Sequence, residues 1–406
     1  MNPRRPSIES LPREPYDVVV IGGGINGAGI ARDAALRGFR VALFEKDDFA
    51  SGTSSRSSKL IHGGIRYLEQ GHLPLVYESS RERRILLRIA PHLVRPIPFL
   101  FPVYGQGPWG RIRLDLGLWL YDLLSLFQNI RPHRMLGRDE TLRREPDLLA
   151  DGLGGAAIYY DAQMDDARIC LSNALEARSK GAEVRNYTRV TALIRDDDGR
   201  IRGVRIRDRI DGRENTVHAR VVVNAAGPWV DEICRMDAPA SSPSLRRTRG
   251  SHLILPALTR GHALVIRSRK DARVLFVIPW RGMSLVGTTD VDYDGDPGKI
   301  HCPPEDRDEL LQEVRRFFPN RPIGRGDVIA SFAGIRPLVS SGASAAVDIS
   351  REERILESGS GLISITGGKF TTYRRIAEKV VDLIHRRLPE RAAARCVTAS
   401  RPLWGG

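Results

Sequence analysis

Apolar and polar positions in the first fifty residues follow the order strand, helix, strand. Residues 16–21 are a short apolar run rich in valine, which is typical of a buried strand in a parallel sheet. A helical stretch follows to about Arg37, Gly38 provides a C-terminal stop, and residues 40–44 predict a second strand. The pattern therefore predicts a βαβ unit.

The same kind of pattern places further elements along the chain. Residues 196–199, Asp-Asp-Asp-Gly, predict a hairpin turn, and residues 246–289 predict mainly antiparallel sheet. Further strands are expected at residues 97–104, 190–195, 201–207, 216–223, 251–256, 262–267, 273–279, 284–289 and 362–366. Helices are expected at residues 78–90, 165–180 and 305–318, with a last helix that ends near His385.

Glycines mark the junction between the first strand and the first helix. Gly22, Gly24 and Gly27 fit the spacing Gly-x-Gly-x-x-Gly, and Glu45 ends the second strand. Glycine lets the backbone approach a pyrophosphate, the helix N-terminus offers N–H groups, and a carboxylate can bind ribose hydroxyls. The combination predicts a dinucleotide site, and a glycine-rich turn without a ligand is the alternative.

Two later segments end in a similar way. The strand that ends at Asn224 leads into Ala225-Ala226-Gly227, and the strand at residues 362–366 leads into Gly367-Gly368-Lys369. We therefore expect an α/β fold, a Rossmann-like, doubly wound parallel sheet built from separated segments, with an inserted, mainly antiparallel substrate domain of α+β type. A site completed from three segments suits a retained flavin better than a nicotinamide that must exchange.

A stretch of small and charged residues follows the second strand. Residues 50–59 are neither periodic nor apolar, and residues 57–69 combine serine and glycine with a lysine, a histidine, an arginine and a tyrosine. Such a segment would be costly to bury without partners, so it is expected to lie over a ligand. A mobile surface loop is the alternative.

Charge narrows the class of partner. The formal net charge is +14, and only seven of the 63 basic residues are lysines. The charge indicates an anionic partner, which could be a phosphorylated substrate, an anionic lipid surface or nucleic acid. The arginines are dispersed without an aromatic-interleaved basic stripe, which argues against nucleic acid. Lys59 and Lys369 are candidates for positions that need a compact ammonium.

The four cysteines lie far apart, which indicates reduced thiols and predicts neither a disulfide nor a metal site.

Residues 112–130 form the most apolar stretch of the chain. Three charged residues interrupt it, so a transmembrane helix is not expected. The segment predicts a buried helix. An amphipathic helix that lies on a membrane surface is the alternative, which Trp119, Tyr121 and the neighbouring arginines support.

Eight motifs occur in order along the chain. They are residues 21–30 (IGGGINGAGI), 57–69 (SSKLIHGGIRYLE), 224–229 (NAAGPW), 250–252 (GSH), 276–280 (FVIPW), 287–290 (GTTD), 334–338 (GIRPL) and 367–374 (GGKFTTYR). Together they resemble the FAD-dependent aerobic, or respiratory, glycerol-3-phosphate dehydrogenases, which belong to the D-amino-acid-oxidase-like flavoprotein superfamily. The similarity covers about residues 15–385.

The resemblance implies a reaction and a setting. The family oxidises sn-glycerol 3-phosphate to dihydroxyacetone phosphate by hydride transfer from C2 to N5 of a bound FAD, and passes the electrons to membrane quinone. It implies a cytoplasmic homodimer attached peripherally to the inner face of the cell membrane, without nucleic acid. A glycerol-3-phosphate oxidase that reduces O2 to H2O2 is the alternative in the same chemistry. A non-catalytic FAD-binding module, or a flavin-dependent RNA-modifying protein, is a remote one.

The resemblance also assigns candidate site residues. His252 is the candidate general base, although a purely hydrogen-bonding role is the alternative, and Arg336 would polarise the oxygen that becomes a carbonyl. The substrate phosphate is expected to contact Arg66, Tyr67, Arg351, Lys369 and Thr372. The FAD is expected to contact Gly22, Gly24, Asn26, Gly27, Glu45, Ser57, Ser58, Lys59, His62, Ala226, Gly227, Gly367, Gly368, Lys369, Phe370 and Thr371.

These assignments imply a domain organisation. The FAD-binding domain is expected to comprise residues 15–75, 150–235 and 330–388, and the substrate-binding domain residues 76–149 and 236–329. Residues 1–14, rich in proline and charge, are expected to form a flexible arm, and residues 389–406 a tail. In the family a helical C-terminal domain follows these residues, and the resemblance leads us to expect a protein without that domain.

Overall fold

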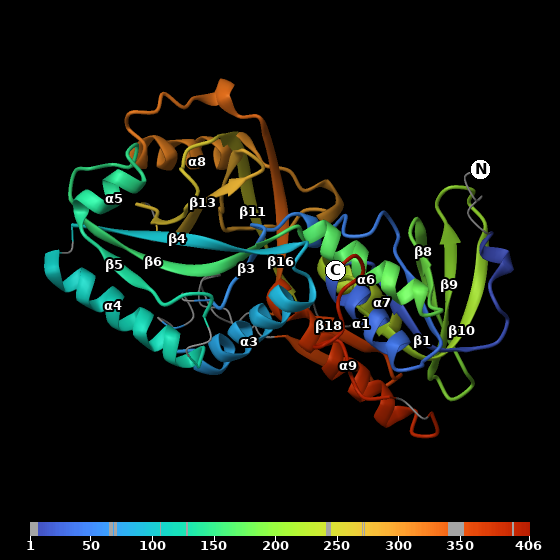
Figure 1. Cartoon of the computed structure of the whole chain (residues 1–406). Helices are drawn as coiled ribbons and strands as arrows, with labels where there is room; N and C mark the ends of the chain where they lie inside the picture. The colour runs from blue at the N-terminus through green and yellow to red at the C-terminus, as the bar shows by residue number, and fades with distance from the viewer. Residues whose placement is uncertain are drawn as a thin grey trace. The chain divides into compact units, whose positions relative to one another are not determined.

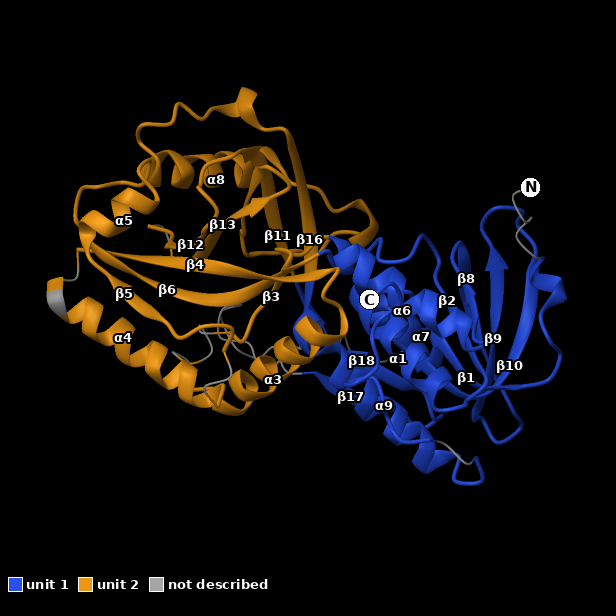
Figure 2. Ribbon diagram, in the orientation of Figure 1, with its two compact units in different colours: residues 1–55, 165–247, 336–406 blue, residues 56–164, 248–335 orange. Residues whose placement is uncertain are grey.

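In the computed structural model, three stretches that lie far apart in sequence form one parallel sheet (Figure 1). The structure describes residues 7–64, 68, 71–105, 107–126, 129–240, 245–269, 271, 273–339, 353–391 and 394–406. The chain divides into unit 1, residues 1–55, 165–247 and 336–406, and unit 2, residues 56–164 and 248–335 (Figure 2). The predicted domains also build one part from three segments, with their divisions at residues 75, 150, 235 and 330.

The sheet of unit 1 has its parallel strands in the order expected for a doubly wound fold. Its strand order is β17-β18-β10-β1-β2-β7, and β18, β10, β1, β2 and β7 run parallel. The strands are β1 (Tyr16–Ile21), β2 (Val41–Phe44), β7 (Glu183–Arg185), β10 (Glu214–Asn224), β17 (Arg354–Glu357) and β18 (Ile363–Thr366). An antiparallel extension adds β8 (Thr188–Arg195) and β9 (Ile201–Asp208) beside β10. The predicted fold class is confirmed.

Helix α1 (Ile25–Leu36) is the central helix of unit 1. It packs against α6 (Asp166–Ser179) and α9 (Tyr373–Arg387), and most of its side chains are buried. A Cβ at Gly29 would lie 2.9 Å from the Tyr373 ring, so glycine permits the close approach of α1 and α9. A shorter helix, α7 (Val230–Asp237), follows β10. The βαβ unit is therefore confirmed, including Gly38, which has a φ of 90° after α1.

The N-terminal residues differ from the expected flexible arm from Ser7 onward. A short 3-10 helix, η1 (Ile8–Ser10), places Ile8 and Leu11 in the core of unit 1. The Ile8 carbonyl accepts a hydrogen bond of 2.6 Å from the Asn215 side chain. Proline and charge predicted flexibility, but two buried apolar side chains and hydrogen bonds from Asn215 and Arg213 hold this segment.

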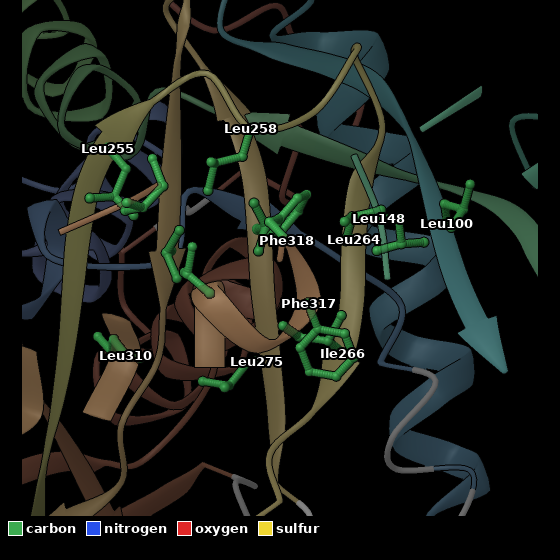
Figure 3. Close-up of a cluster of buried hydrophobic side chains, with 14 of the residues drawn as sticks. Leu100, Leu148, Leu255, Leu258, Leu264, Ile266, Leu275, Leu310, Phe317 and Phe318 are labelled. Atoms are coloured by element: carbon green, nitrogen blue, oxygen red, sulfur yellow. The ribbon is translucent and has the colours of Figure 1, made fainter. Parts of the chain in front are cut away.

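Both faces of the sheet in unit 2 are buried, as strand β12 (Ala263–Arg267) shows. Along β12, Leu264 and Ile266 face α8, whereas Ala263 and Val265 face α3 and α4. Figure 3 shows the first cluster, in which Phe317 and Phe318 pack against the strands. The helices are α3 (Leu73–Ile89), α4 (Gly107–Leu124), α5 (Arg138–Arg144) and α8 (Pro304–Phe317).

The strands of this sheet are mainly antiparallel, as predicted for residues 246–289. The order is β15-β11-β14-β13-β12-β4-β6-β3, with β16 beside β11 and β5 beside β6. Among the strand pairs whose register the structure describes, β12–β4 is the one that runs parallel. The strands are β3 (Leu60–Ile61), β4 (Val94–Tyr104), β5 (Arg134–Leu136), β6 (Leu153–Met164), β11 (Leu245–Pro256), β12 (Ala263–Arg267), β13 (Val274–Trp280), β14 (Met283–Gly287), β15 (Val291–Asp292) and β16 (Ala330–Val339). The sequence analysis did not identify β6, although it pairs with β4 along nearly its whole length.

Candidate functional site

The carboxyl ends of four parallel strands meet at one edge of the sheet in unit 1. The register places Ile21 of β1 beside Phe44 of β2 and beside Asn224 of β10, and Asn224 beside Ser364 of β18. The segments that follow are therefore neighbours: residues 22–24, Glu45, residues 225–229 and residues 367–372. Ligands of open parallel sheets bind at this edge.

The first glycine junction is shaped by backbone contacts that exclude any side chain. Gly22 has a φ of 105°, and a Cβ on Gly27 would lie 1.8 Å from the Gly22 carbonyl oxygen. Gly24 adopts an extended conformation as the N-cap of α1 and provides no side-chain cap. The Ile25 N–H donates to Ser54 Oγ at 2.9 Å. Asn26, predicted to contact FAD, lies half-buried in the first turn.

Glu45 lies beside this junction with both carboxylate oxygens engaged. Oε2 accepts a hydrogen bond of 2.6 Å from the Gly23 N–H, and Oε1 accepts one of 2.8 Å from the Asp47 N–H. Burial raises the pKa of the Glu45 carboxyl, although the Gly23 N–H and the nearby Lys46 charge oppose the shift. Each oxygen retains a second lone pair, so ribose hydroxyls can still donate to it.

A second junction of the same type follows β18. Gly367 and Gly368 have φ angles of 70° and 86°, and a Cβ on Gly368 would lie 2.7 Å from Ile376 Cδ1. Lys369 then begins the short 3-10 helix η7 (Phe370–Thr372), which leads directly into α9. Thr371 and Thr372 are buried, and Lys369 and Phe370 are half-buried.

The segment after β10 lies between these two junctions. Ala226 precedes Gly227, which has a φ of 55° and begins the 3-10 helix η3 (Gly227–Trp229). The Lys46 ammonium lies 3.8 Å from the centroid of the Trp229 ring. The sequence analysis singled out neither Lys46 nor Ser54, although the scarcity of lysine in this chain was a usable signal for Lys46.

The arrangement fits a dinucleotide cofactor. Two helix N-termini that follow glycine junctions supply N–H groups for a pyrophosphate, and Glu45 supplies a carboxylate for ribose hydroxyls. The three segments that form this edge come from residues 16–45, 214–229 and 363–372. The fold of unit 1 is thus consistent with a dinucleotide that is bound by three separated segments of the chain.

His252 lies on β11 in unit 2 and is closely surrounded. Its Nε2 is 2.9 Å from Ser58 Oγ, and its ring is stacked on Phe332 with centroids 4.9 Å apart. A Cβ on Gly287 would lie 2.4 Å from His252 Cδ2, so only glycine fits beside the ring. The Lys59 ammonium lies 5.6 Å from the Phe332 centroid. The structure thus brings His252, the candidate general base, together with Ser58 and Lys59, which were expected to contact FAD.

A buried carboxylate fixes the residues next to His252. Asp306 of α8 accepts hydrogen bonds from Ser251 Oγ at 2.5 Å, from Thr289 Oγ1 at 3.0 Å and from the Arg249 guanidinium at 2.9 and 3.0 Å. Burial alone would raise the pKa of Asp306, but the Arg249 guanidinium and the two hydroxyls hold it below its usual value. Asp306 was not predicted as part of the site, because nothing in its helical sequence context distinguishes it.

The remaining predicted site residues fall into three groups. Ser57 Oγ accepts a hydrogen bond of 3.0 Å from the Lys59 N–H, and His62 lies half-buried just after β3. Arg336 is half-buried on β16 and, with Lys369 and Thr372, belongs to unit 1. Three predicted phosphate-binding residues lie outside the described part of the chain: Arg66, Tyr67 and Arg351.

A family comparison decides the class of protein. The model of the family described as FAD dependent oxidoreductase matches residues 17–374. The chain belongs to this family. The match spans both glycine junctions, Glu45 and His252, so FAD, the cofactor expected from the sequence, is confirmed as the cofactor of the family.

Relatives within the FAD dependent oxidoreductase family are more specific. The aerobic glycerol-3-phosphate dehydrogenase of Staphylococcus haemolyticus is 40% identical over 403 residues, which cover 98% of this chain and 72% of the relative. The protein of that name from Staphylococcus aureus strain USA300 is 40% identical over 382 residues, 94% of this chain and 69% of the relative. The predicted resemblance to this group is confirmed.

Solved structures agree with this assignment. The glycerol-3-phosphate dehydrogenase of Bacillus halodurans, solved in complex with FAD, has a TM-score of 0.79 and 36% identity, and the comparison covers 97% of this chain and 68% of that chain. The L-alpha-glycerophosphate oxidase of Mycoplasma pneumoniae has a TM-score of 0.74 at 19% identity over 96% of this chain and 97% of that chain, which shows a shared fold.

Proposed function

We propose that this protein oxidises sn-glycerol 3-phosphate to dihydroxyacetone phosphate with FAD and passes the electrons to quinone. The observation that carries the proposal is the 40% identity to an aerobic glycerol-3-phosphate dehydrogenase over 98% of the chain. That match includes the two glycine junctions and the His252 cluster. The dianionic substrate also agrees with the net charge of +14.

The residues of the chain have distinct roles in this proposal. FAD supplies the hydride acceptor when it is bound. The His252 ring accepts the proton of the C2 hydroxyl, and Ser58 Oγ contacts this ring at Nε2, 2.9 Å away. Arg336 stabilises negative charge on the oxygen that becomes the carbonyl. Lys369 and Thr372 bind the phosphate, together with Arg66, Tyr67 and Arg351.

The reductive half-reaction tests this function directly. Purified, FAD-loaded protein mixed with sn-glycerol 3-phosphate without oxygen is expected to lose its oxidised flavin absorbance near 450 nm on a timescale of about a second or less. Glycerol and sn-glycerol 1-phosphate are the matched controls, since they lack the phosphate or the correct configuration. Unchanged absorbance with glycerol 3-phosphate would contradict the proposed substrate.

The electron acceptor needs a separate measurement. A quinone-dependent dehydrogenase should reduce a soluble ubiquinone analogue faster than it consumes oxygen, whereas an oxidase should form one H2O2 for each substrate oxidised. Parallel assays of quinone reduction and peroxide yield, with the same enzyme preparation, separate the two. A stoichiometric peroxide yield would replace quinone by O2 in the proposal.

Helix α4 supports the membrane part of the proposal. Its solvent-facing side is apolar: Leu116 is 64% exposed, and Trp119 and Leu123 are each 54% exposed. Its inward side carries Tyr121 and Asp122, both buried. The prediction of a buried helix for residues 112–130 is therefore wrong for the solvent-facing side of α4, where these apolar side chains are exposed. No helix within the described residues is long and apolar enough to cross a membrane.

Charge beside α4 favours an anionic lipid surface as the occupant of this face. Helix α3 packs against α4, and Arg81, Arg84 and Arg88 lie exposed along one side of α3. Arg113 is exposed on α4 itself, and the partly exposed Asp115 of α4 is paired with His133 at 3.0 Å. Apolar side chains flanked by arginines are typical of helices that lie in a membrane interface. We define Trp109, Ile112, Leu116, Trp119, Leu120 and Leu123 as the outer face of α4.

Replacement of one outer-face leucine should weaken membrane binding. Leu116→Glu is expected to lower partitioning to phosphatidylglycerol vesicles by about tenfold or more, because burial of a leucine contributes about 1.5–3 kcal/mol. Cosedimentation with vesicles measures the effect. Ile210→Glu is the matched control, since Ile210 is 67% exposed in unit 1. Equal loss in both variants, or unchanged binding of Leu116→Glu, would remove α4 from the proposed membrane surface.

The resemblance also implies properties that need their own measurements. A homodimer and a cytoplasmic location at the inner face of the membrane both stay predictions. Sedimentation equilibrium of the holoenzyme tests the first, and fractionation of cells followed by a high-salt wash tests the second. Release of the protein by salt is the expected result, because arginines contribute to the proposed attachment and salt screens them.

A further inference from the structure

Four elements of unit 2 meet at one buried carboxylate oxygen. Asp161 of β6 pairs with Arg83 of α3, and both side chains are 2% exposed. The hydroxyl of Tyr121 on α4 donates to Asp161 Oδ1 at 3.1 Å and accepts from Arg83 Nη1 at 2.8 Å. The backbone N–H of Gly63 donates to the same Asp161 Oδ1 at 3.2 Å.

Gly63 fits this network too closely for any side chain. A Cβ at this position would lie 2.1 Å from Tyr121 Oη and 2.6 Å from Ser80 Oγ. Its φ lies outside the left-handed region, so the contact and not the backbone conformation requires glycine here. The Gly63 backbone is therefore held directly against Tyr121 and Asp161.

The network completes the attachment of the segment that carries Ser58 and Lys59. The Lys59 carbonyl accepts a hydrogen bond of 2.8 Å from the Met164 N–H, and Leu60 and Ile61 pair with β6. Strand β3 has only two residues, so these ladder contacts end at Ile61. Asp161 then holds Gly63 through its side chain. Ser58, whose Oγ lies 2.9 Å from His252 Nε2, comes directly before this attachment in sequence.

A purely structural role does not explain a buried ion pair well. Burial of two charges costs several kcal/mol, and an apolar replacement of the same volume is often equally stable. Burial also raises the pKa of the Asp161 carboxyl, although Arg83 opposes the shift. The ion pair holds a hydrogen-bond acceptor in a fixed place for the Gly63 N–H. Apolar side chains could not supply such an acceptor.

We infer that Asp161, together with Arg83 and Tyr121, is a positioning residue for the reaction. It fixes the segment 58–63 so that Ser58 orients the His252 ring for proton transfer. The inference rests on the proposed function, in which His252 accepts the substrate proton. A displacement of about 1 Å at a reacting group can cost about a hundredfold in rate, so a rigid anchor is consequential.

Tyr121→Phe tests the inference with little risk to folding. Loss of its hydroxyl, which is bonded to charged groups, is expected to lower the melting temperature without unfolding the protein. The rate of anaerobic flavin reduction is expected to fall about tenfold, and its pH profile should move in the same direction as in Ser58→Ala. Gly63→Ala, which forces a Cβ against Tyr121, should show the same profile. Tyr104→Phe is the matched control, because Tyr104 donates to the Leu149 carbonyl at 2.9 Å in the same unit.

A double variant decides whether the network acts through Ser58. If it does, Ser58→Ala/Tyr121→Phe should be little slower than Ser58→Ala alone. An NMR titration of the His252 ring in the holoenzyme, assigned with His252→Gln, measures the ring without turnover. Ser58→Ala and Tyr121→Phe should change this titration in the same direction. The charged groups near the ring are Lys59, over Phe332, and Asp306, bonded to Ser251.

The outcomes separate this inference from the proposed function. If the wild-type enzyme does not reduce its flavin with glycerol 3-phosphate, the proposed function fails, whereas the NMR titration still tests the positioning. If the wild-type enzyme reacts but Tyr121→Phe only lowers the melting temperature, with an unchanged pH profile, the inference is overturned. Fully additive effects in the double variant overturn it as well.

Discussion

Replacement of His252 by glutamine is expected to slow the anaerobic reduction of FAD by glycerol 3-phosphate by about 10²- to 10⁴-fold, the range typical for loss of a general base. Glutamine retains polar atoms near Ser58 Oγ but cannot accept the substrate proton. Stopped-flow absorbance in single turnovers measures the reduction step without the electron acceptor. Affinity for FAD should stay close to that of the wild-type enzyme, because the glycine junctions lie in unit 1.

The control for this prediction is a half-buried histidine of unit 2. His262 Nδ1 lies 2.8 Å from Glu145 Oε1, and neither residue belongs to the proposed site. His262→Gln should therefore change the melting temperature but not the rate of flavin reduction. A His252→Gln enzyme that reduces flavin at more than half the wild-type rate would show that another group accepts the proton, and the close packing of His252 would then be structural.

The pH dependence of the same step gives a second readout. If His252 is the base, the wild-type rate should fall at low pH, where the ring is protonated, and this limb should be absent from the residual rate of His252→Gln. Retention of an identical acid limb in the variant would point to a carboxylate as the base. The two measurements thus distinguish loss of proton transfer from loss of packing.

The dinucleotide-binding edge was predictable because its signals are local. The residues of β1, the spacing of Gly22 and Gly27, and the stop at Gly38 each depend on neighbours in sequence. The short apolar runs of β12 and β13 likewise predicted strands of unit 2. The close contact of Gly27 with the Gly22 backbone shows why this spacing predicts the junction: a side chain at residue 27 would not fit.

Features that depend on long-range contacts were not predictable. Strand β6 lacks a clear alternation because its residues are buried on both faces, and Asp161 within it gives no sign of its partners Arg83 and Gly63. The first residues looked flexible from their proline and charge, yet Ile8 is fully buried against β10. Helix α4 showed an apolar stretch, but only the structure shows that its outward side is the apolar one.

Gly27→Ala is expected to abolish retention of FAD through purification. The added Cβ would lie 1.8 Å from the Gly22 carbonyl oxygen, which is backbone and cannot rotate away. Helix α1 would have to move from the end of β1, and the N–H groups of its first turn would move with it. We expect the affinity for FAD to fall by at least about a hundredfold and the melting temperature to fall by several degrees, since overpacking costs about 1–3 kcal/mol.

Two further variants separate loss of cofactor from loss of fold. Gly359→Ala is the matched control, because a Cβ there meets no atom within 4 Å and the residue lies in the same unit. It should retain FAD at a one-to-one ratio. Glu45→Gln preserves the shape of the side chain but removes the charge and one of the two oxygens that accept from the Gly23 and Asp47 N–H groups. It should weaken FAD binding and lower the melting temperature of the apoprotein less than Gly27→Ala does. If Gly27→Ala bound FAD with wild-type affinity, measured by quenching of flavin fluorescence, the first glycine junction could not be the pyrophosphate site.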